Sequence, residues 1–315
     1  MCGIAGVVSL DGRPIEPEWI KRMCDALAHR GPDDAGYSFF RVGEGRRGEG
    51  GYWCSFADER FRHVNEHLPP FGGPYCREEL SKGTFSVGLG HRRLAIIDLT
   101  PYGHQPMSNS DCRYWITYNG ELYNFPELRD DLRARGHVFR TRSDTEVLLH
   151  LWEEYGRDCL PMLDGMFAFA VYDRVANVVT LARDRFGVKP LYYAVADGYV
   201  VFASEIKGIL ASGLVRPSIH PAAMTEYFTF QNIFSRQTLF RNVQLLGPGE
   251  RLEFSPGSLA EPSPRRYHAG FPSVDRSIVD ETQAAETVAD AFAQAIQRQL
   301  VSDVEVGSYL SGGMD

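Results

Sequence analysis

Hydrophobic and polar positions along the chain fall into strand-like and helix-like patterns. Apolar positions at helical spacing predict helices over residues 17–28, 126–135 and 144–155. Short apolar, β-rich runs predict strands over residues 4–10, 87–90, 94–99, 114–118, 167–172, 178–182, 191–194 and 199–203. Strands, then helices, then strands again, without regular alternation, favour an α+β fold of layered antiparallel sheets over a doubly wound parallel sheet.

Two regions interrupt this pattern. From residue 39 to about 85 the periodicity dissolves among glycines and prolines, and we expect an inserted surface loop there. A composition break over residues 211–221 predicts a domain boundary and thus two domains, 2–216 and 217–315. The second region contains a predicted helix over 280–300 and a predicted strand over 304–310, which leads into the sequence SGGMD.

Composition excludes several classes of protein. With 315 residues, 43% of them hydrophobic and 23% charged, the chain has enough apolar material for a sizeable core and is not a disordered protein. A net charge of −8 argues against a nucleic-acid partner. The longest apolar run, Met166 to Tyr172, is far too short for a membrane span, which takes about 20 residues. Six cysteines without a CxxC pair argue against a disulfide scaffold, and we expect a cytoplasmic protein.

The predicted insertion contains residue types that bind metals. Cys54, His63, His67 and Cys76 make a zinc site conceivable, with the two histidines at positions i and i+4. However, these residues are barely denser here than chance would place them. We therefore predict no metal site, and favour a surface loop beside the active site or at a partner interface.

The strongest candidate for chemistry is Cys2. Removal of the initiator methionine would place this thiol next to a free α-amino group, whose pKa of about 7.7–8 suits it to take the thiol proton near neutral pH. Such a nucleophile carries its own base. A cysteine at position 2 is nevertheless weak evidence alone.

The motifs that follow Cys2 strengthen this interpretation. In chain order they are CGIAG from Cys2, HRGPDD from His29, GHRRLAIID from Gly90, YNGELYN from Tyr118, RTRSDTE from Arg140, LDGMFAFAVYD from Leu163, ARDRFGVKPLYY from Ala182 and FASEIK from Phe202. With these motifs in this order the chain resembles the class II, N-terminal-nucleophile glutamine amidotransferases, and most closely the glutamine-hydrolysing asparagine synthetases. The resemblance implies a four-layer αββα sandwich of antiparallel sheets.

Glutamine carries a carboxylate, an ammonium and the γ-amide to be cleaved, and the motifs offer a partner for each. Arg93 suits the carboxylate, and Asp144 and Glu121 suit the ammonium. The Asn119 side-chain amide and the Gly120 N–H would stabilise the tetrahedral oxyanion, and a residue without Cβ would let the amide approach the backbone. The resemblance implies the same roles, and adds a glutamine site lined by the backbone of Leu94, Ala95, Ile96 and Ile97.

Each of these residues also has an ordinary structural interpretation. Asn119-Gly120 alone is a hairpin-turn signal, Asp144 after Ser143 is a typical helix-start acid, and Arg93 could be a solvated charge at a strand edge. Their joint occurrence after Cys2 favours glutaminase chemistry.

The C-terminal sequence SGGMD suggests a second activity. A Gly-Gly pair after a strand is most often a turn, but the resemblance implies the pyrophosphate-binding loop of an ATP pyrophosphatase domain. The expected ATP-binding residues are Leu310, Ser311, Gly312, Gly313 and Asp315. A parallel α/β layer needs further strands and helices, so we expect this domain to be incomplete here.

We therefore expect a glutamine-dependent asparagine synthetase, with L-glutamine, L-aspartate and ATP as substrates, Mg²⁺ for the ATP step and no cofactor for the glutaminase step. A homodimer is also expected. Two alternatives stay open: amidation of another carboxylate, on a sugar or a secondary metabolite, or a non-catalytic glutamine-binding scaffold.

Overall fold

Two antiparallel sheets form the body of the protein. The computed structural model describes residues 1–42, 52–270 and 280–313. The seven-stranded sheet has the order β11-β9-β10-β1-β4-β2-β3, and its strands are β1 (Gly3–Ser9), β2 (Asp34–Phe40), β3 (Trp53–Ala57), β4 (Val87–Arg93), β9 (Tyr192–Ala196), β10 (Tyr199–Ala203) and β11 (Gln244–Leu245). The first strand of the chain thus lies at the centre, between β10 and β4.

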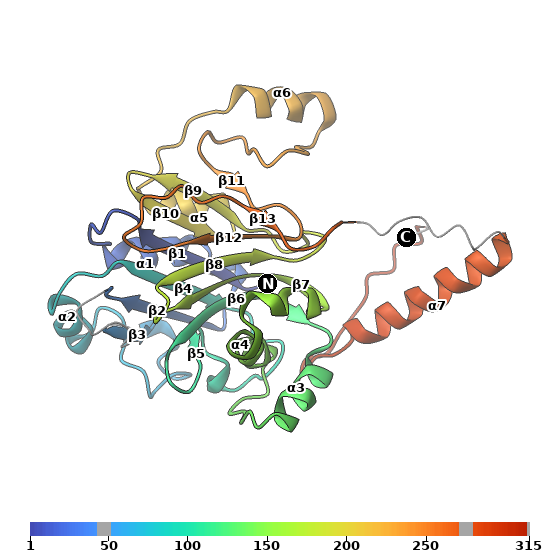
Figure 1. Cartoon of the computed structure of the whole chain (residues 1–315), viewed down its shortest axis with the longest axis horizontal. Coiled ribbons are helices and arrows are strands. Elements are labelled where there is room, and N and C mark those ends of the chain that lie inside the picture. The colour runs from blue at the N-terminus through green and yellow to red at the C-terminus, as the bar shows by residue number, and fades with distance from the viewer. Residues whose placement is uncertain (43–51, 271–279, 314–315) are drawn as a thin grey trace.

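The six-stranded sheet lies face to face with the first (Figure 1). Its order is β13-β12-β8-β7-β6-β5, and its strands are β5 (Met107–Ser108), β6 (Tyr114–Leu122), β7 (Gly165–Asp173), β8 (Val178–Arg183), β12 (Glu250–Phe254) and β13 (Arg265–Arg266). β6 pairs with β7 along its whole length, from Tyr114 opposite Asp173 to Leu122 opposite Gly165. On its other side β6 pairs only with the short β5, so its C-terminal half has a free edge.

Helices cover the outer faces of both sheets. Helices α1 (Pro17–Ala26) and α5 (Ile206–Ala211) pack on the first sheet, and α3 (Phe125–Ala134) and α4 (Asp144–Tyr155) cover the second. Apolar side chains fill three layers: under α1 and α5, between the sheets, and under α3 and α4. This arrangement is a four-layer αββα sandwich, which confirms the predicted α+β class and its antiparallel sheets.

The expected insertion over residues 39–85 is not a surface loop. Its described part contains the end of β2, the strand β3 and the helix α2 (Pro74–Ser81). Cys54, Phe56, Cys76 and Phe85 are all buried in the core under α1. The glycines and prolines that obscured the pattern lie between these elements, so the segment is an integral edge of the first sheet. The zinc site considered there does not form, because His63 and His67 are exposed while both cysteines are buried in that core.

Two other predicted strands are absent from the described chain. Residues 94–99 form a loop after β4, because the backbone there turns around the Arg93 side chain. Residues 304–310 are exposed and extended, and no described strand pairs with them. The other predicted strands and the four predicted helices are confirmed to within a few residues.

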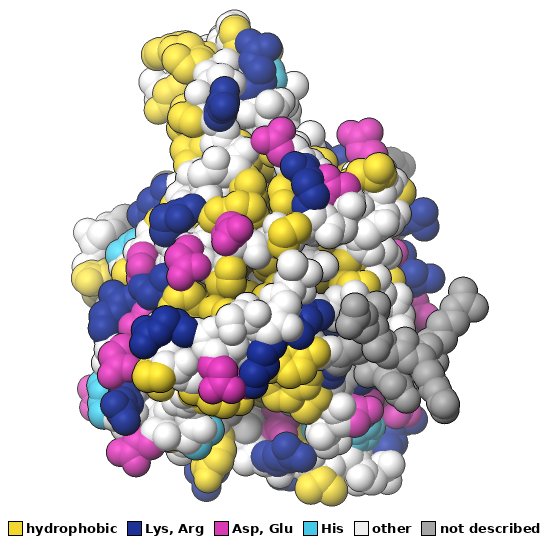
Figure 2. Space-filling view, turned by 90° about the vertical axis from the view of Figure 1, so that its left-hand side faces the viewer, with side chains coloured by type: hydrophobic (Ala, Val, Ile, Leu, Met, Phe, Trp, Pro, Cys, Tyr) yellow, Lys and Arg dark blue, Asp and Glu magenta, His cyan; other side chains and the backbone are white. Residues whose placement is uncertain are grey.

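The chain after residue 216 contributes to both sheets and also leaves the body. β11 pairs with β9 and β12 pairs with β8, whereas α6 (Pro221–Phe230) projects from the top of the molecule (Figure 1). Figure 2 shows hydrophobic side chains gathered on that projection. On α6 itself, Phe228 is 73% exposed. α7 (Glu281–Gln299) lies beside the body, and none of its described side chains is buried. No described helix is long and apolar enough to cross a membrane.

Candidate active site

The N-terminus is held from two sides. Arg30 donates from Nε to the Cys2 carbonyl oxygen (2.8 Å) and from Nη1 to Glu205 (2.8 Å). Two residues further on, the Ile4 N–H donates to the Ser204 hydroxyl (3.0 Å). Arg30 comes from HRGPDD, and Ser204 and Glu205 come from FASEIK. The HRGPDD and FASEIK motifs, to which the sequence alone assigns no role, therefore fix the direction in which Cys2 leaves β1.

The Cys2 thiol lies against the loop that follows β4. Its Sγ is 3.4 Å from the Leu94 nitrogen, which donates to it, and 3.5 Å from the Leu94 carbonyl oxygen. Burial raises the pKa of the thiol, while the Leu94 N–H and the nearby positive charges of the N-terminus and Arg93 oppose that rise. Burial also lowers the pKa of the Met1 α-amine, which precedes Cys2 in the unprocessed chain.

Arg93 is buried within the same loop. Its Nη1 donates to the Thr100 carbonyl (2.9 Å), and its Nη2 faces the carbonyls of Ile97 (3.4 Å) and Asp98. A Cβ at Gly103 would overlap the guanidinium, so a glycine is required there. A guanidinium has five N–H donors, and this arrangement leaves donors for a ligand. Arg93 is therefore a fixed charge in the interior and not a solvated strand-edge residue.

The free edge of β6 supplies the backbone of the site. Residues 118, 120 and 122 direct their N–H groups to the same edge, because alternate residues of a strand face the same way. The Tyr118 N–H donates to Gln105 Oε1 (2.7 Å), and the Leu122 N–H donates to Asp144 Oδ2 (3.1 Å). The Gly120 N–H lies between them and faces the pocket. Asn119-Gly120 is thus part of a strand and not a hairpin turn.

Gly120 is required by the sheet itself. A Cβ there would lie 2.5 Å from the Met166 carbonyl oxygen on β7. The space that the missing side chain leaves is therefore occupied by β7, and not by an approaching ligand as the sequence suggested. The neighbouring Asn119 is 1% exposed, and its side-chain Nδ2 has no hydrogen-bond partner in the described part of the chain. A buried amide donor without a partner is costly in a protein interior unless a ligand accepts its hydrogen bond.

Asp144 is the first residue of α4 and faces the same pocket. Ser143 caps the helix by accepting from the Thr145 N–H (3.1 Å), which leaves the Asp144 carboxylate free to accept from the Tyr118 hydroxyl (3.0 Å). Burial raises the pKa of Asp144 to about 6. Burial likewise raises the pKa of Glu121. Both carboxylates would be stabilised by a cation that entered the pocket.

One pocket collects these residues from β4, β6, α4, the N-terminus and several loops. Among the described residues it is lined by Met1, Cys2, Arg93, Leu94, Ile96, Ile97, Gly103, Gln105, Tyr118, Asn119, Gly120, Glu121, Ser143, Asp144, Thr145 and Lys189. All the residues expected at the glutamine site are present except Ala95. The Ala95 N–H instead donates to the Asp33 carboxylate (2.8 Å) and fixes the loop from outside.

Lys189 is a pocket residue that the sequence analysis missed. Asp184 holds its loop by accepting from the Phe186, Val188 and Lys189 N–H groups at 2.9 to 3.1 Å. Burial lowers the pKa of Lys189, and the Glu121 carboxylate opposes that shift. The available signal was that Lys189 is one of only four lysines in the chain and lies inside a quoted motif.

The expected ATP-binding residues are not part of this pocket. Leu310 is 97% exposed, and Ser311, Gly312 and Gly313 are exposed as well. Asp315 lies outside the described residues. The segment before them does contact the glutamine-site loop: the Asp98 N–H donates to the Asp303 carboxylate (2.8 Å), and the Asp303 N–H donates to the Ile96 carbonyl (3.1 Å).

Comparison with protein families agrees with the site. The glutamine amidotransferase domain family matches residues 62–268, about two thirds of the chain. The chain belongs to the glutamine amidotransferase family. The asparagine synthase family matches residues 287–315, which include α7 from its second turn and the SGGMD sequence.

Similar amidotransferases include several named asparagine synthetases. The chain is 35% identical over its whole length to asparagine synthetase [glutamine-hydrolyzing] 1 of Bacillus subtilis, and 36% identical to asparagine synthetase [glutamine-hydrolyzing] 3 of the same organism. It covers 42% and 44% of those two proteins. Amidase chyE of Penicillium rubens is 33% identical over 82% of this chain, which covers 38% of that protein.

A solved structure shares the fold of this amidotransferase. It is the glutamine phosphoribosylpyrophosphate amidotransferase of Bacillus subtilis complexed with ADP and GMP, with a TM-score of 0.60 and 22% identity. The match covers 86% of this chain and 50% of the other. It supports the N-terminal-nucleophile sandwich independently of the sequence motifs.

Proposed function

We propose that this chain hydrolyses L-glutamine to glutamate and ammonia at the Cys2 pocket. The observation that carries the proposal is the unpartnered amide donor of Asn119 beside the Gly120 N–H, in the same pocket as the Cys2 thiol. Two donors at a nucleophile are the arrangement that stabilises a tetrahedral oxyanion. Arg93 on one side and Asp144 with Glu121 on the other complement the carboxylate and ammonium of the free amino acid.

The reaction would proceed in two steps. The α-amine of the processed N-terminus takes the Cys2 proton, the thiolate attacks the γ-carbonyl carbon, and the oxyanion forms opposite Asn119 and Gly120. The carbon–nitrogen bond then breaks, ammonia leaves with the transferred proton, and a glutamyl thioester remains. Water attacks the thioester, releases glutamate and restores the thiol. The α-amine of a free N-terminal cysteine would have an ordinary pKa of about 7.7–8, which suits it to accept the thiol proton near neutral pH.

An ammonia-release assay tests this proposal directly. The purified chain, with removal of Met1 verified by mass spectrometry, should release equal amounts of glutamate and ammonia from glutamine. Cys2→Ala should abolish turnover, and so should any tag that stays attached to the N-terminus. Cys112→Ala, which removes a partly exposed cysteine outside the pocket, should leave turnover unchanged. An N-terminally tagged protein with full activity would contradict the mechanism.

For the complete protein we propose glutamine-dependent asparagine synthesis, in which the ammonia amidates an ATP-activated aspartate with release of AMP and pyrophosphate. The asparagine synthase match over residues 287–315 and the names of the similar proteins support this proposal. We also propose that residues 2–216 form the glutaminase domain and that residues 217–315 begin the synthetase domain. The short strands β11 to β13 of the second part extend the two sheets of the first. We further propose a cytoplasmic homodimer.

The described C-terminal residues do not by themselves fit ATP and Mg²⁺. The Gly313 N–H donates to the Ser311 hydroxyl (3.3 Å), and residues 310–313 are exposed and line no part of the Cys2 pocket. A carboxylate for Mg²⁺ would have to come from Asp315 or from elsewhere. We therefore expect the chain as given to show no aspartate-dependent pyrophosphate release. Release by this chain alone would contradict that expectation.

A different acceptor is the second candidate. It is favoured by the similarity to Amidase chyE, whose name differs from those of the synthetases although its identity to this chain is close to theirs. In that case the same glutaminase would supply ammonia to another carboxylate. Feeding the complete protein aspartate and alternative carboxylic acids, with pyrophosphate release as the readout, distinguishes the two.

A further inference from the structure

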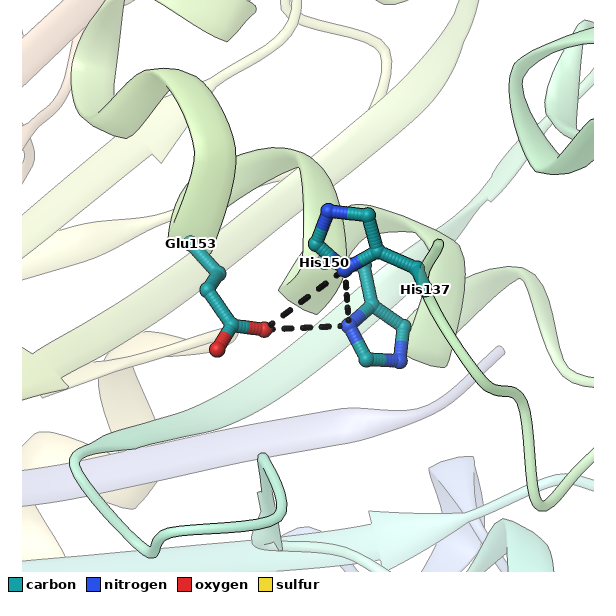
Figure 3. A group of neighbouring side chains, drawn as sticks. All are labelled: His137, His150 and Glu153. Atoms are coloured by element: carbon teal, nitrogen blue, oxygen red, sulfur yellow. Dashed lines mark hydrogen bonds and ion pairs between the residues drawn. The ribbon is translucent and has the colours of Figure 1, made fainter. Parts of the chain in front are cut away.

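A second cluster of reactive side chains lies away from the Cys2 pocket. His150 and Glu153 are three residues apart on α4, so they share one face of that helix. His137 comes from the turn after α3, where Gly136 adopts a positive φ of 98° and the His137 N–H donates back to the Leu132 carbonyl (3.1 Å). Figure 3 shows the three side chains pointing toward one another. None of them was singled out from the sequence.

The three facing atoms are spaced like the ligands of one metal ion. His137 Nδ1 and His150 Nδ1 are 3.1 Å apart, and Glu153 Oε2 lies 3.1 Å from the second and 3.9 Å from the first. A triangle with these sides has a centre about 2 Å from every corner, which is the length of a Zn–N or Zn–O bond in proteins. Among the described residues this is the one such group of three.

The outer nitrogen of each ring faces a further carboxylate. His137 Nε2 is 3.3 Å from Glu154 Oε2, and His150 Nε2 is 3.9 Å from Glu146 Oε1. A proton on His137 Nε2, donated to Glu154, leaves Nδ1 with a lone pair that can bind a metal ion. Without an ion, hydrogen bonds join the facing atoms of His137, His150 and Glu153. A cation between these atoms would take the place of those hydrogen bonds.

The surroundings hold the third ligand and leave room for a fourth. Asn109 Nδ2 faces the other carboxylate oxygen of Glu153 at 3.3 Å, which orients the residue toward the histidines. The Phe139 ring packs on His150 with 4.8 Å between centroids. The Glu153 side chain is 32% exposed, so water can reach the point between the ligands. Two imidazoles, one carboxylate and a water make a tetrahedral set that suits Zn²⁺.

We propose that His137, His150 and Glu153 form a binding site for a divalent transition-metal ion, Zn²⁺ by preference, that fastens the turn after α3 to the outer half of α4. The site is separate from the glutamine pocket, although α4 is common to both. A bound ion would replace the hydrogen bonds among the three ligand atoms with three coordination bonds. It would therefore stabilise the packing of residues 137–143 against the helix.

Metal titration tests the proposal. The probe is Zn²⁺, which is added to the protein in competition with a chromophoric chelator. The protein is first stripped of metal by chelation and has no polyhistidine tag. It contains the Cys2→Ala substitution, so that the active-site thiol does not compete for the ion. We expect one ion per chain with micromolar or tighter affinity. His137→Gln and Glu153→Gln should each lower the affinity at least tenfold, and Glu154→Gln should lower it by about 10–100-fold, as expected for a carboxylate that orients a ligand. His67→Gln removes an exposed histidine elsewhere and should change nothing.

Two further measurements separate metal binding from a merely structural role. Co²⁺ should give the visible absorption of a tetrahedral site in the parent protein and not in His137→Gln. Zn²⁺ should raise the melting temperature of the parent and leave that of His137→Gln unchanged. If His137→Gln fails to fold, the more exposed Glu153→Gln serves in its place. Weak binding without defined stoichiometry, or equal affinity in the parent and the variants, would overturn the proposal.

Discussion

Replacement of Asn119 by alanine separates catalysis from stability more cleanly than any other change in the pocket. The Asn119 side chain is buried, and its Nδ2 donates to no described group. Truncation to Cβ therefore removes a donor without leaving an acceptor unpaired. Since a buried donor without a partner costs free energy, we expect the melting temperature of Asn119→Ala to equal or exceed that of the parent.

The catalytic cost follows from the number of donors at the oxyanion. Asn119 Nδ2 and the Gly120 N–H are the two donors that face the pocket at this point of β6, so the variant keeps one of them. Loss of one such donor typically costs about 2.7–4 kcal/mol of transition-state stabilisation, or roughly 10²–10³-fold in kcat. The KM for glutamine should change little, because the ground-state amide oxygen carries far less charge than the oxyanion.

The assay is steady-state glutamine hydrolysis, with thermal unfolding of the same preparations. A matched control is Asn177→Ala. This residue has a positive φ of 54°, and its side chain bonds the Tyr172 hydroxyl (3.0 Å) and the Pro256 carbonyl (3.1 Å), far from the pocket residues in the chain. It should lower the melting temperature and leave kcat unchanged, the reverse of Asn119→Ala. An unaltered kcat in Asn119→Ala, or a loss confined to KM, would refute the oxyanion role.

Three other predictions concern binding, pH and dynamics. Arg93→Ala should raise the KM for glutamine about 10–150-fold, the equivalent of a charge-assisted hydrogen bond of ~1.5–3 kcal/mol. It should also lower the melting temperature, because the Thr100 and Ile97 carbonyls lose their donor. An unchanged KM would argue against carboxylate binding. Burial raises the pKa of Asp144 from 3.8 to about 6, so the folded state without glutamine binds the proton more tightly than the unfolded state, and stability should fall as pH rises from about 4 to 6 and stay lower above that. Asp144→Asn should flatten this dependence, stabilise the free protein at pH 7 and weaken glutamine binding; a slope unchanged in the variant would assign it to another group. In hydrogen exchange, α7 should exchange far faster than α4, since α4 has nine buried residues and α7 has none among those described; equal protection would contradict the exposed position of α7.

The sequence could predict elements whose pattern follows from burial on one side. The strands around Ile4, Phe169 and Val200 are apolar runs in the centre of a sheet, and the sandwich buries them as expected. Residues 94–99 have the same apolar, β-branched composition, yet they form a loop. The cause is a local side-chain requirement: the buried Arg93 guanidinium needs carbonyl acceptors, and the backbone that directly follows it curves to supply them. Composition does not encode such a requirement.

The site was predicted more completely than the segments around it. Cys2, Arg93, Asn119 and Asp144 were identified because their functional groups match the parts of one small molecule. Lys189 was missed, because its place in the pocket depends on how Asp184 holds a loop by its N–H groups. The region 39–85 was misjudged for a related reason: its strand β3 is only five residues long, and its burial depends on pairing with β2. Pairing between segments is visible only in the folded chain.

The central position of β1 has a consequence for how the protein comes into being. Cys2 directly precedes a strand whose neighbours are β4 and β10, and the Ala5–Ala203 pairing joins the two ends of a 200-residue interval. At about 5–20 residues per second, synthesis of that interval takes roughly 10–40 s. During that time the Cys2 thiol is already part of the growing chain and is exposed to solvent, with the ordinary reactivity of a free thiol. The loop that covers Sγ is synthesised with Leu94, and the second neighbour of β1 is synthesised with β10. The pocket around Cys2 can therefore form only after β10 has been made, although Cys2 is among the first residues of the chain.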